Sequence, residues 1–162
     1  MNTKKAKLDD CTGFYRGQVL DNADSSQLGR IKVNIHGVFD GISSQYLPWA
    51  VPAMPLFSGS GTDQGCFCVP DVGTYVWCFF EGSNLYQPVY FAEASDGVHG
   101  KILERTTNYP NRRILKTKNE IVIYIDDTDK EIKVDHPSGA YVTIDGSGNI
   151  EIKGTTVHIN PT

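Results

Sequence analysis

The sequence lacks any run of about 18 consecutive apolar residues, so it contains no segment long enough to cross a membrane as a helix. Its first ten residues carry three lysines with no apolar stretch behind them, so a secretory signal peptide is not expected. On this basis the protein is expected to fold in a cytoplasm, where Cys11, Cys66, Cys68 and Cys78 stay as thiols.

Positive charge is also scarce, because 15 Lys and Arg stand against 19 Asp and Glu, for a net charge of −4. Such a chain has no global positive field that attracts phosphates, so nucleic acid is not an expected partner. Hydrophobic residues make up 40% of the chain and charged residues 21%, which predicts a packed core rather than disorder. A length of 162 residues gives room for one ordinary domain and a short appendage.

Motifs of catalysis and cofactor binding are missing as well. The sequence has no nucleophile elbow, phosphate loop or dinucleotide fingerprint, and the glycine-containing segment 145–148 is interpreted as a hairpin turn. The four histidines, His36, His99, His136 and His158, lack the paired spacing of metal ligands and are expected at the surface or in turns. We therefore expect neither enzymatic activity nor a cofactor.

Two other groups of residues could bind a metal ion. Cys66 and Cys68 would lie on one face of a strand and could begin a zinc site with Cys78 nearby, but core packing is favoured because no convincing second pair accompanies them. The second group is an acidic turn without the glycine of a calcium loop, so a solvated turn is favoured over a cation site. Its members are Asp126, Asp127, Asp129 and Glu131.

The sequence does contain an alternation of apolar and polar residues with period two, which recurs from Phe14 almost to the last residue and predicts an all-β protein. In the segment 30–36, Ile31, Val33 and Ile35 face one way, as in a half-buried strand. Pro48, Pro52 and Pro55 cannot donate ladder hydrogen bonds, so the segment 47–54 is expected to lie at an edge or to break at bulges. Five or six short strands favour a small closed barrel. The expected strands are Phe14 to Leu20, Arg30 to His36, Leu47 to Met54, Cys66 to Val69, Thr74 to Phe80 and Pro88 to Ala92.

The composition changes between residues 96 and 118, where glycine, asparagine and basic residues replace most of the apolar ones. This change predicts an N-terminal arm over 1–12, a barrel over 13–95, a linker over 96–118 and a C-terminal segment over 119–162. The last segment repeats short apolar couplets about every eight residues, with turn-forming residues between them. The couplets are Ile123 and Ile125, Ile132 and Val134, Val142 and Ile144, Ile150 and Ile152, Val157 and Ile159.

Each couplet gives one narrow apolar row that a strand of about five residues cannot bury by itself. Three chains wound about one axis could turn the couplets inward. A single-chain antiparallel meander packed on the barrel is the alternative, and periodicity alone leaves both open. In the three-chain arrangement the polar residues between the apolar ones would face outward, namely Glu131, Lys133, Thr143, Glu151, Lys153 and His158.

Five motifs stand in order along the first part of the chain: Phe14-Tyr15-Arg16-Gly17, Leu28-Gly29-Arg30-Ile31-Lys32-Val33, Leu47-Pro48-Trp49-Ala50, Val69-Pro70-Asp71-Val72-Gly73-Thr74-Tyr75-Val76-Trp77 and Gln87-Pro88-Val89-Tyr90-Phe91. In order and spacing they resemble the N-terminal OB domain of phage baseplate hub and tail-spike proteins. Two further motifs follow, His136-Pro137-Ser138-Gly139 and Ile144-Asp145-Gly146-Ser147-Gly148-Asn149-Ile150. These repeats are similar to the start of that family's trimeric β-helix, so the resemblance covers most of the chain from Gly13 to Gly154.

The resemblance implies an OB-type β-barrel followed by an intertwined trimeric β-helix, with the couplets as the core of the shaft. It implies a homotrimer mounted under the baseplate hub proteins of a contractile tail, which punctures the host outer membrane or cell surface. Such a spike would be assembled in the host cytoplasm and located in the virion, at the tip of the tail baseplate.

The chain departs from parts of this family in two ways. The linker is too short to hold the lysozyme domain that some members carry. The segment 157–162 has a single histidine, His158, in place of the His-x-His pair that binds iron at the apex of other members. We therefore expect no apical metal, and a separate tip protein of the PAAR type is expected to cap the shaft.

A rival interpretation from another class is an OB-fold module that binds single-stranded nucleic acid or an oligosaccharide. In that case aromatic side chains of the barrel would form stacking surfaces. The candidates are Tyr15, Trp49, Tyr75 and Trp77.

Overall fold

The computed structural model describes residues 11–55, 64–95, 98 and 101–159, and it divides the chain into two compact units, 1–100 and 101–162. Each unit is described by itself. Most of the predicted N-terminal arm, 1–12, lies outside the described residues. Both units are built from strands with three short 3₁₀ turns, so the prediction of an all-β protein is confirmed. No helix in the described ranges is long and apolar enough to cross a membrane.

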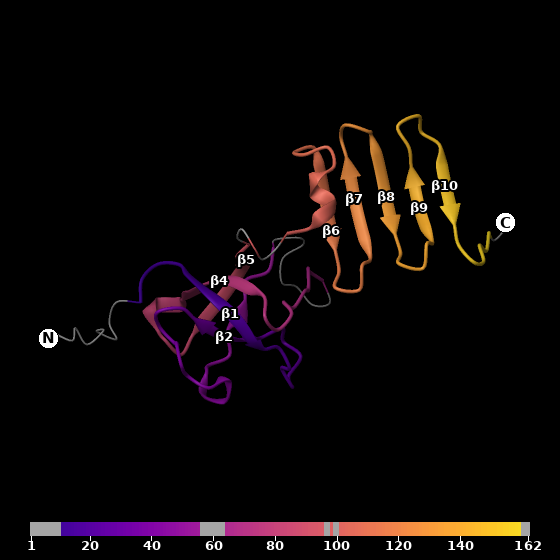
Figure 1. Ribbon diagram of the computed structural model, residues 1–162. Coiled ribbons are helices and arrows are strands. Elements are labelled where there is room, and N and C mark those ends of the chain that lie inside the picture. Colours follow the sequence, from indigo (N-terminus) through magenta and orange to yellow (C-terminus); the bar gives the residue numbers. More distant parts are fainter. Residues whose placement is uncertain (1–10, 56–63, 96–97, 99–100, 160–162) are drawn as a thin grey trace, which may run out of the picture. The chain divides into compact units, whose positions relative to one another are not determined.

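The first unit is a five-stranded sheet with the order β2-β1-β4-β5-β3 (Figure 1). Neighbouring strands are antiparallel except β3, which pairs in parallel with β5. Next to the two edge strands, Ile31 and Ala50 exchange backbone hydrogen bonds of 3.1 and 2.8 Å, so the sheet closes into a barrel. The strands are β1 Tyr15–Asp21, β2 Lys32–Ile35, β3 Val51–Pro52, β4 Tyr75–Phe80 and β5 Pro88–Glu93, with the turns η1 Ser44–Tyr46 and η2 Glu81–Ser83.

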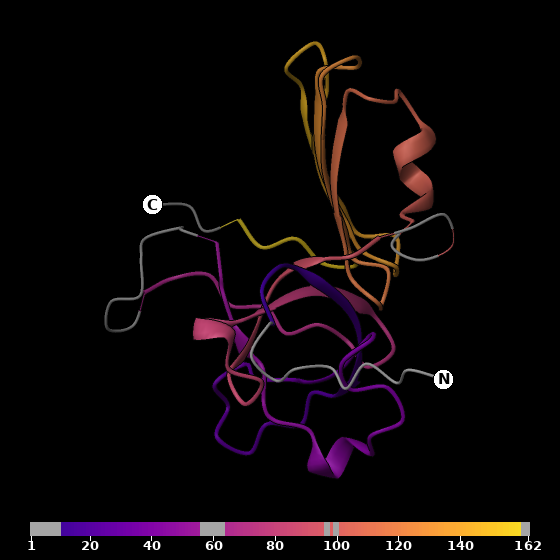
Figure 2. The ribbon, with the colours of Figure 1, turned by 90° about the vertical axis from the view of Figure 1, so that its left-hand side faces the viewer.

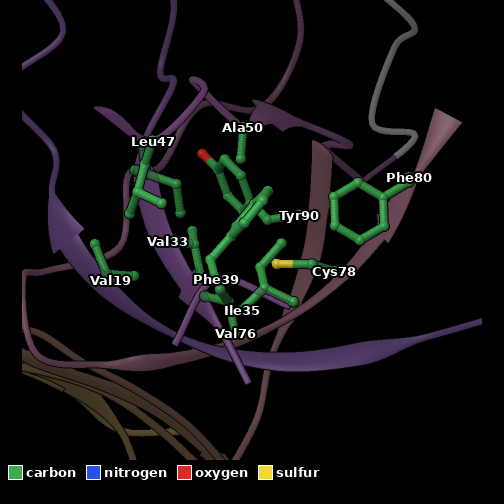
Figure 3. Packing of buried hydrophobic residues seen from close by; sticks show 11 residues of the cluster. Val19, Val33, Ile35, Phe39, Leu47, Ala50, Val76, Cys78, Phe80 and Tyr90 are labelled. Carbon is green, nitrogen blue, oxygen red and sulfur yellow. The ribbon is translucent and has the colours of Figure 1, made fainter. Parts of the chain in front are cut away.

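The barrel encloses one hydrophobic core, as the alternating pattern predicts (Figure 3). Ile31, Val33 and Ile35 are all buried, with at most 2% of their surface exposed. Gly17 of β1 faces β2 so closely that a Cβ atom there would meet Val33 Cγ1 at 2.4 Å. Only glycine fits at this position of the barrel. The core consists of Val19, Ile31, Val33, Ile35, Phe39, Leu47, Ala50, Val76, Cys78, Phe80 and Tyr90.

The loop between β1 and β2 is held by Asp24, whose side chain is only 3% exposed. Its carboxylate accepts hydrogen bonds from the backbone N–H groups of Ser26 and Leu28 and a bidentate pair from Arg30, at 3.0 and 2.7 Å. The hydrogen bond from Arg30 holds the pKa of Asp24 far below its ordinary value. The Tyr90 hydroxyl donates to the Gly29 carbonyl at 2.6 Å, which ties this loop to β5.

Two expected strands of the barrel differ from the structure. The segment 47–54 forms only the two-residue edge strand β3 and the Ala50 bridge, because Pro48 and Pro52 have no N–H to donate to a ladder. The segment 66–69 forms no strand at all. Cys66 and Cys68 are exposed thiols, so their assignment to the core was wrong, whereas Cys78 is fully buried.

The second unit is an antiparallel meander with the order β10-β9-β8-β7-β6 (Figure 1). Its first strand falls inside the stretch expected to be a linker, 96–118, and pairs along its whole length with β7. The last couplet, Val157 and Ile159, follows the sheet without forming a strand. The strands are β6 Arg112–Lys116, β7 Val122–Asp126, β8 Glu131–Asp135, β9 Tyr141–Ile144 and β10 Ile150–Lys153, and the turn η3 Leu103–Thr106 precedes them.

Turn chemistry sets the hairpins of the meander. The Asp145 carboxylate accepts hydrogen bonds from the backbone N–H groups of Ser147 and Asn149, both at 2.9 Å, so the predicted hairpin turn between β9 and β10 is confirmed. A Cβ atom at Gly146 would lie 2.5 Å from the Asp129 carbonyl oxygen of the β7–β8 turn. Glycine therefore lets two successive turns at one end of the sheet stack closely.

Candidate assembly surface

One face of the second sheet is aliphatic, and its side chains form two rows that run across the strands. Cross-strand partners share a face, so the register defines both rows. The first row consists of Leu115, Ile123, Val134, Val142 and Ile152. The second row consists of Arg113, Ile125, Ile132, Ile144 and Ile150. We call the ten positions together the aliphatic face; nine of them are aliphatic and one is charged.

The aliphatic face is largely exposed among the described residues. All ten couplet residues identified from the sequence are exposed, with values from 39% at Ile144 to 82% at Ile159. Eight of them lie on the aliphatic face, and Val157 and Ile159 lie beyond β10. The sequence prediction missed Leu115, which is 72% exposed and extends the first row to β6. The sequence signal that could have identified Leu115 is the alternation of Arg113 and Leu115 inside the presumed linker.

The opposite face of the sheet, called the polar face below, is closed by hydrogen bonds between its own side chains. Glu131 accepts from the Tyr124 hydroxyl at 2.7 Å and from the Thr143 hydroxyl at 3.0 Å, so one carboxylate joins three strands. The Tyr141 hydroxyl donates to Glu151, and the ammonium of Lys133 lies 4.9 Å from the centre of the Tyr141 ring. Burial and the hydrogen bond to Glu131 raise the pKa of Tyr124 above its ordinary value.

The turn η3 contacts this polar face beside β6 (Figure 2). Lys116 of β6 donates to Glu104 of η3 at 2.6 Å. This ion pair lowers the pKa of Glu104. The polar face is thus partly covered by η3, while each aliphatic side chain of the opposite face is at least 39% exposed.

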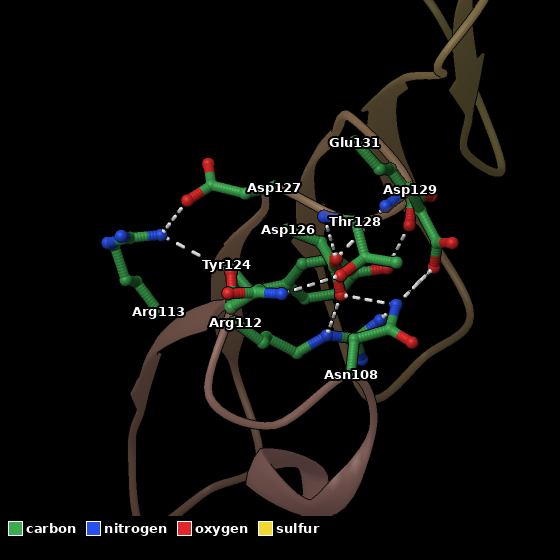
Figure 4. A network of polar contacts seen from close by, with 10 residues as sticks. Asn108, Arg112, Arg113, Tyr124, Asp126, Asp127, Thr128, Asp129 and Glu131 are labelled. Carbon is green, nitrogen blue, oxygen red and sulfur yellow. Dashed lines mark hydrogen bonds and ion pairs between the residues drawn. The ribbon is translucent and has the colours of Figure 1, made fainter.

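A buried ion pair anchors the first hairpin of the sheet (Figure 4). Arg112 Nε donates to Asp126 at 2.6 Å, and the two side chains are 10% and 0% exposed. Asp126 also accepts from Asn108 Nδ2 at 3.0 Å and from the backbone N–H groups of Thr128 and Asp129 at 2.9 and 3.1 Å. The prediction of a solvated acidic turn was therefore wrong for Asp126, whose carboxylate is fully buried and paired.

The electrostatics of Asp126 follow from these contacts. Burial alone raises the pKa of this carboxyl, but the hydrogen bonds from Arg112, Asp129, Asn108 and Thr128 together outweigh it and lower the pKa to about 2. Asp126 is thus ionised at neutral pH and serves as an acceptor for four donor groups.

No group of three or more His, Cys, Asp or Glu side chains within the described ranges is arranged to hold a metal ion. His36 lies 3.5 Å from Asp40, His136 bonds Ser138 in the β8–β9 turn, and His158 is exposed. His99 lies outside the described residues.

Of the aromatic residues proposed as stacking surfaces, Tyr75 and Trp77 share the outer face of β4, where they alternate with the buried Val76 and Cys78. Tyr15 packs edge-on against Phe80 of the core, at 5.4 Å between ring centres. Trp49 lies beside the cationic groups of Arg30 and Lys32, at 5.6 and 5.0 Å. Trp77 is 39% exposed. Arg16 of the neighbouring strand covers Tyr75 at 5.0 Å.

The barrel can now be compared with known proteins. Residues 15–93 match a family described as the type VI secretion system/phage-baseplate injector OB domain. The matched range begins with the first residue of β1 and ends with the last residue of β5, so it coincides with the barrel. A search among curated proteins finds no match. The resemblance stated from the barrel motifs is confirmed over residues 15–93, which match the injector OB domain, while the resemblance of the following repeats to a trimeric β-helix stays a prediction.

Proposed function

We propose that three copies of this chain pack their aliphatic faces together as a spike shaft, and that the assembly is the membrane-puncturing tip of a contractile phage tail. The observation that supports this proposal is the contrast between the two faces of the second sheet. On the polar face, side chains hydrogen-bond one another, whereas the nine Ile, Val and Leu side chains of the aliphatic face are 39–72% exposed among the described residues. The injector OB domain supports a role as a baseplate spike.

The free energy available for this association is substantial. Fully burying a large aliphatic side chain is worth about 1.5–3 kcal/mol. The eight couplet residues on the sheet have 39–68% of their surface exposed, so covering them is worth about 1 kcal/mol each. This gives roughly 8 kcal/mol per chain before the loss of entropy on association. The number of three chains comes from the resemblance to baseplate spikes.

The proposed role requires stiffness, and we propose no catalytic activity for this chain. Three such sheets packed around one axis would form a rod with a dry aliphatic core, in which β7, β8 and β9 are each hydrogen-bonded on both sides by strands of their own chain. Such a rod resists local unfolding when sheath contraction drives it into the host outer membrane or cell surface. The polar faces, with Lys133, Thr143 and Glu151, would then lie on the outside.

The partners follow from the same arrangement. Baseplate hub proteins would bind above the barrels, in the virion at the tip of the tail baseplate. The sheet ends on the edge strand β10, and Val157 and Ile159 beyond it are 45% and 82% exposed. We propose that a PAAR-type tip protein covers this apolar end of the shaft, with no apical metal held by His158.

A charge on the aliphatic face tests the proposal. In the Ile144→Asp variant three carboxylates would meet on the axis without partners, so we expect only monomers by size-exclusion chromatography with light scattering. The matched control is Lys153→Asp, since Lys153 is exposed on the polar face of β10 and its replacement leaves the aliphatic face intact. A folded, trimeric Ile144→Asp protein would contradict the proposed inward orientation.

A further inference from the structure

Arg113 is the single charged residue among the ten positions of the aliphatic face. It lies on the first strand, directly across from Ile125, and continues the row that Ile132, Ile144 and Ile150 form on the following strands. Its guanidinium pairs with Asp127, and Nη1 also donates to the Asn111 carbonyl at 3.2 Å. The ion pair therefore occupies one corner of an otherwise aliphatic surface.

The rest of the aliphatic face repeats from strand to strand, and this repetition creates a problem of alignment. Strands β7 to β10 each present two aliphatic side chains at equivalent positions, spaced by about 4.8 Å across the sheet. If two copies are offset by one strand, most aliphatic side chains of one copy would still contact aliphatic side chains of the other. Surfaces with such weakly specified register are prone to slippage.

We propose that the Arg113–Asp127 pair sets the level at which the copies of this chain align, an inference that rests on the proposed three-chain shaft. In the aligned assembly all three pairs lie together at the β6 end, where their charged groups stay in water. Arg113 and Asp127 have 64% and 56% of their side chains exposed, as a pair in that position requires.

An offset of one strand in either direction buries one such pair. If one copy is displaced along the shaft by one strand, a β6 strand comes to lie beside a β7 strand of an adjacent copy. Depending on the direction, this β6 strand belongs to the displaced copy or to its neighbour. Arg113 then lies against Ile125 of the adjacent copy, away from water. Burying an ion pair against aliphatic side chains costs desolvation energy that the aligned arrangement avoids.

The test compares full-length variants by mass and by the isoleucine methyl resonances of the protein. The double variant Arg113→Leu/Asp127→Asn completes the aliphatic row and removes both charges. We expect it to assemble into trimers or larger open-ended species that show two or more Ile144 methyl resonances, because offset copies are no longer equivalent. The wild-type trimer should show one Ile144 resonance, assigned by its loss in an Ile144→Val variant.

Two further variants test whether the alignment of the copies depends on an ion pair at this position or on the loss of any ion pair from the sheet. Lys116 lies on the same strand as Arg113 but on the polar face, where it pairs with Glu104 of η3, so Lys116→Leu/Glu104→Gln should keep a single Ile144 resonance. The exchange Arg113→Asp/Asp127→Arg restores an ion pair and should also give one resonance. A single resonance in Arg113→Leu/Asp127→Asn trimers, or several in the exchanged variant, would overturn the inference while leaving the trimer intact. A monomeric wild type would instead remove the shaft on which the inference rests.

Discussion

At the scale of single residues, close backbone approaches and buried charges are the features that this fold tolerates least. Gly17 packs against β2, and Asp126 collects four donor groups in the first hairpin of the sheet. Neither role is visible from residue type alone, since the sequence offers 16 glycines and 19 acidic residues with similar surroundings. The structure identifies these two positions as sensitive to substitution.

Replacing Gly17 by alanine should destabilise the barrel. The new Cβ would lie 2.4 Å from Val33 Cγ1 and 2.8 Å from the Asn34 carbonyl oxygen, so β1 and β2 must move apart. We expect a loss of about 1–3 kcal/mol in the free energy of unfolding, measured by urea denaturation. Gly154→Ala is the control, because its Cβ would meet nothing closer than 3.4 Å. Equal stability of Gly17→Ala and wild type would contradict this close packing.

The Asp126 carboxyl predicts a specific dependence of stability on pH. Its pKa falls from 3.8 to about 2 on folding, so its stabilising contribution is complete above about pH 4 and disappears as the pH drops toward 2. The Asp126→Asn variant should melt at least about 5 °C below wild type at pH 7, and this difference should narrow between pH 4 and 2. Circular dichroism melts measure both quantities. A difference that stays constant down to pH 2 would show that this carboxyl is not the group responsible.

At the scale of elements, the sequence pattern predicts well the strands that neighbouring strands cover on one face. It does not show whether a given segment has another strand to pair with. Ile31, Val33 and Ile35 are buried as predicted, because their strand has neighbours that cover one face. The segment 66–69 is apolar throughout yet forms no strand, since an apolar run does not supply a hydrogen-bonding partner. Conversely β6 was assigned to a linker because its composition is mostly basic, although its pairing with β7 is complete.

The prediction of the aliphatic face from the couplets was also incomplete. Their spacing predicted which residues share a face, and the register brings eight of the ten into two rows. Spacing could not show that Leu115 and Arg113 complete those rows. It also could not show that Asp126 is buried, because acidic turn residues are usually solvated and the partners Arg112 and Asn108 lie 14 and 18 residues away.

The edge strand β10 gives a prediction at this scale. It pairs only with β9, and all four of its residues are exposed in the single chain. In an Ile125→Asp variant, which alters the aliphatic face on the distant strand β7, we expect monomers whose β10 amides exchange hydrogen about tenfold faster than in wild type. Hydrogen exchange followed by mass spectrometry measures this. Equal exchange in the two proteins would mean that no other chain covers β10 in the wild type.

At the scale of the whole molecule, the chain joins an injector OB domain to a sheet with one uncovered aliphatic face. The barrel has its own hydrophobic core. The sheet has its hydrogen-bonded polar network but no hydrophobic core on its other face. This asymmetry is why we propose that the second unit is completed by other copies of the same chain.

The most direct test of this account is the mass of the full-length protein in solution, measured by light scattering with and without SDS at room temperature. We expect a mass of three chains, which persists in SDS because the aliphatic faces of the three chains are buried together in a dry core. A monomer of 17.9 kDa in plain buffer would contradict the account and leave the second sheet as an isolated meander.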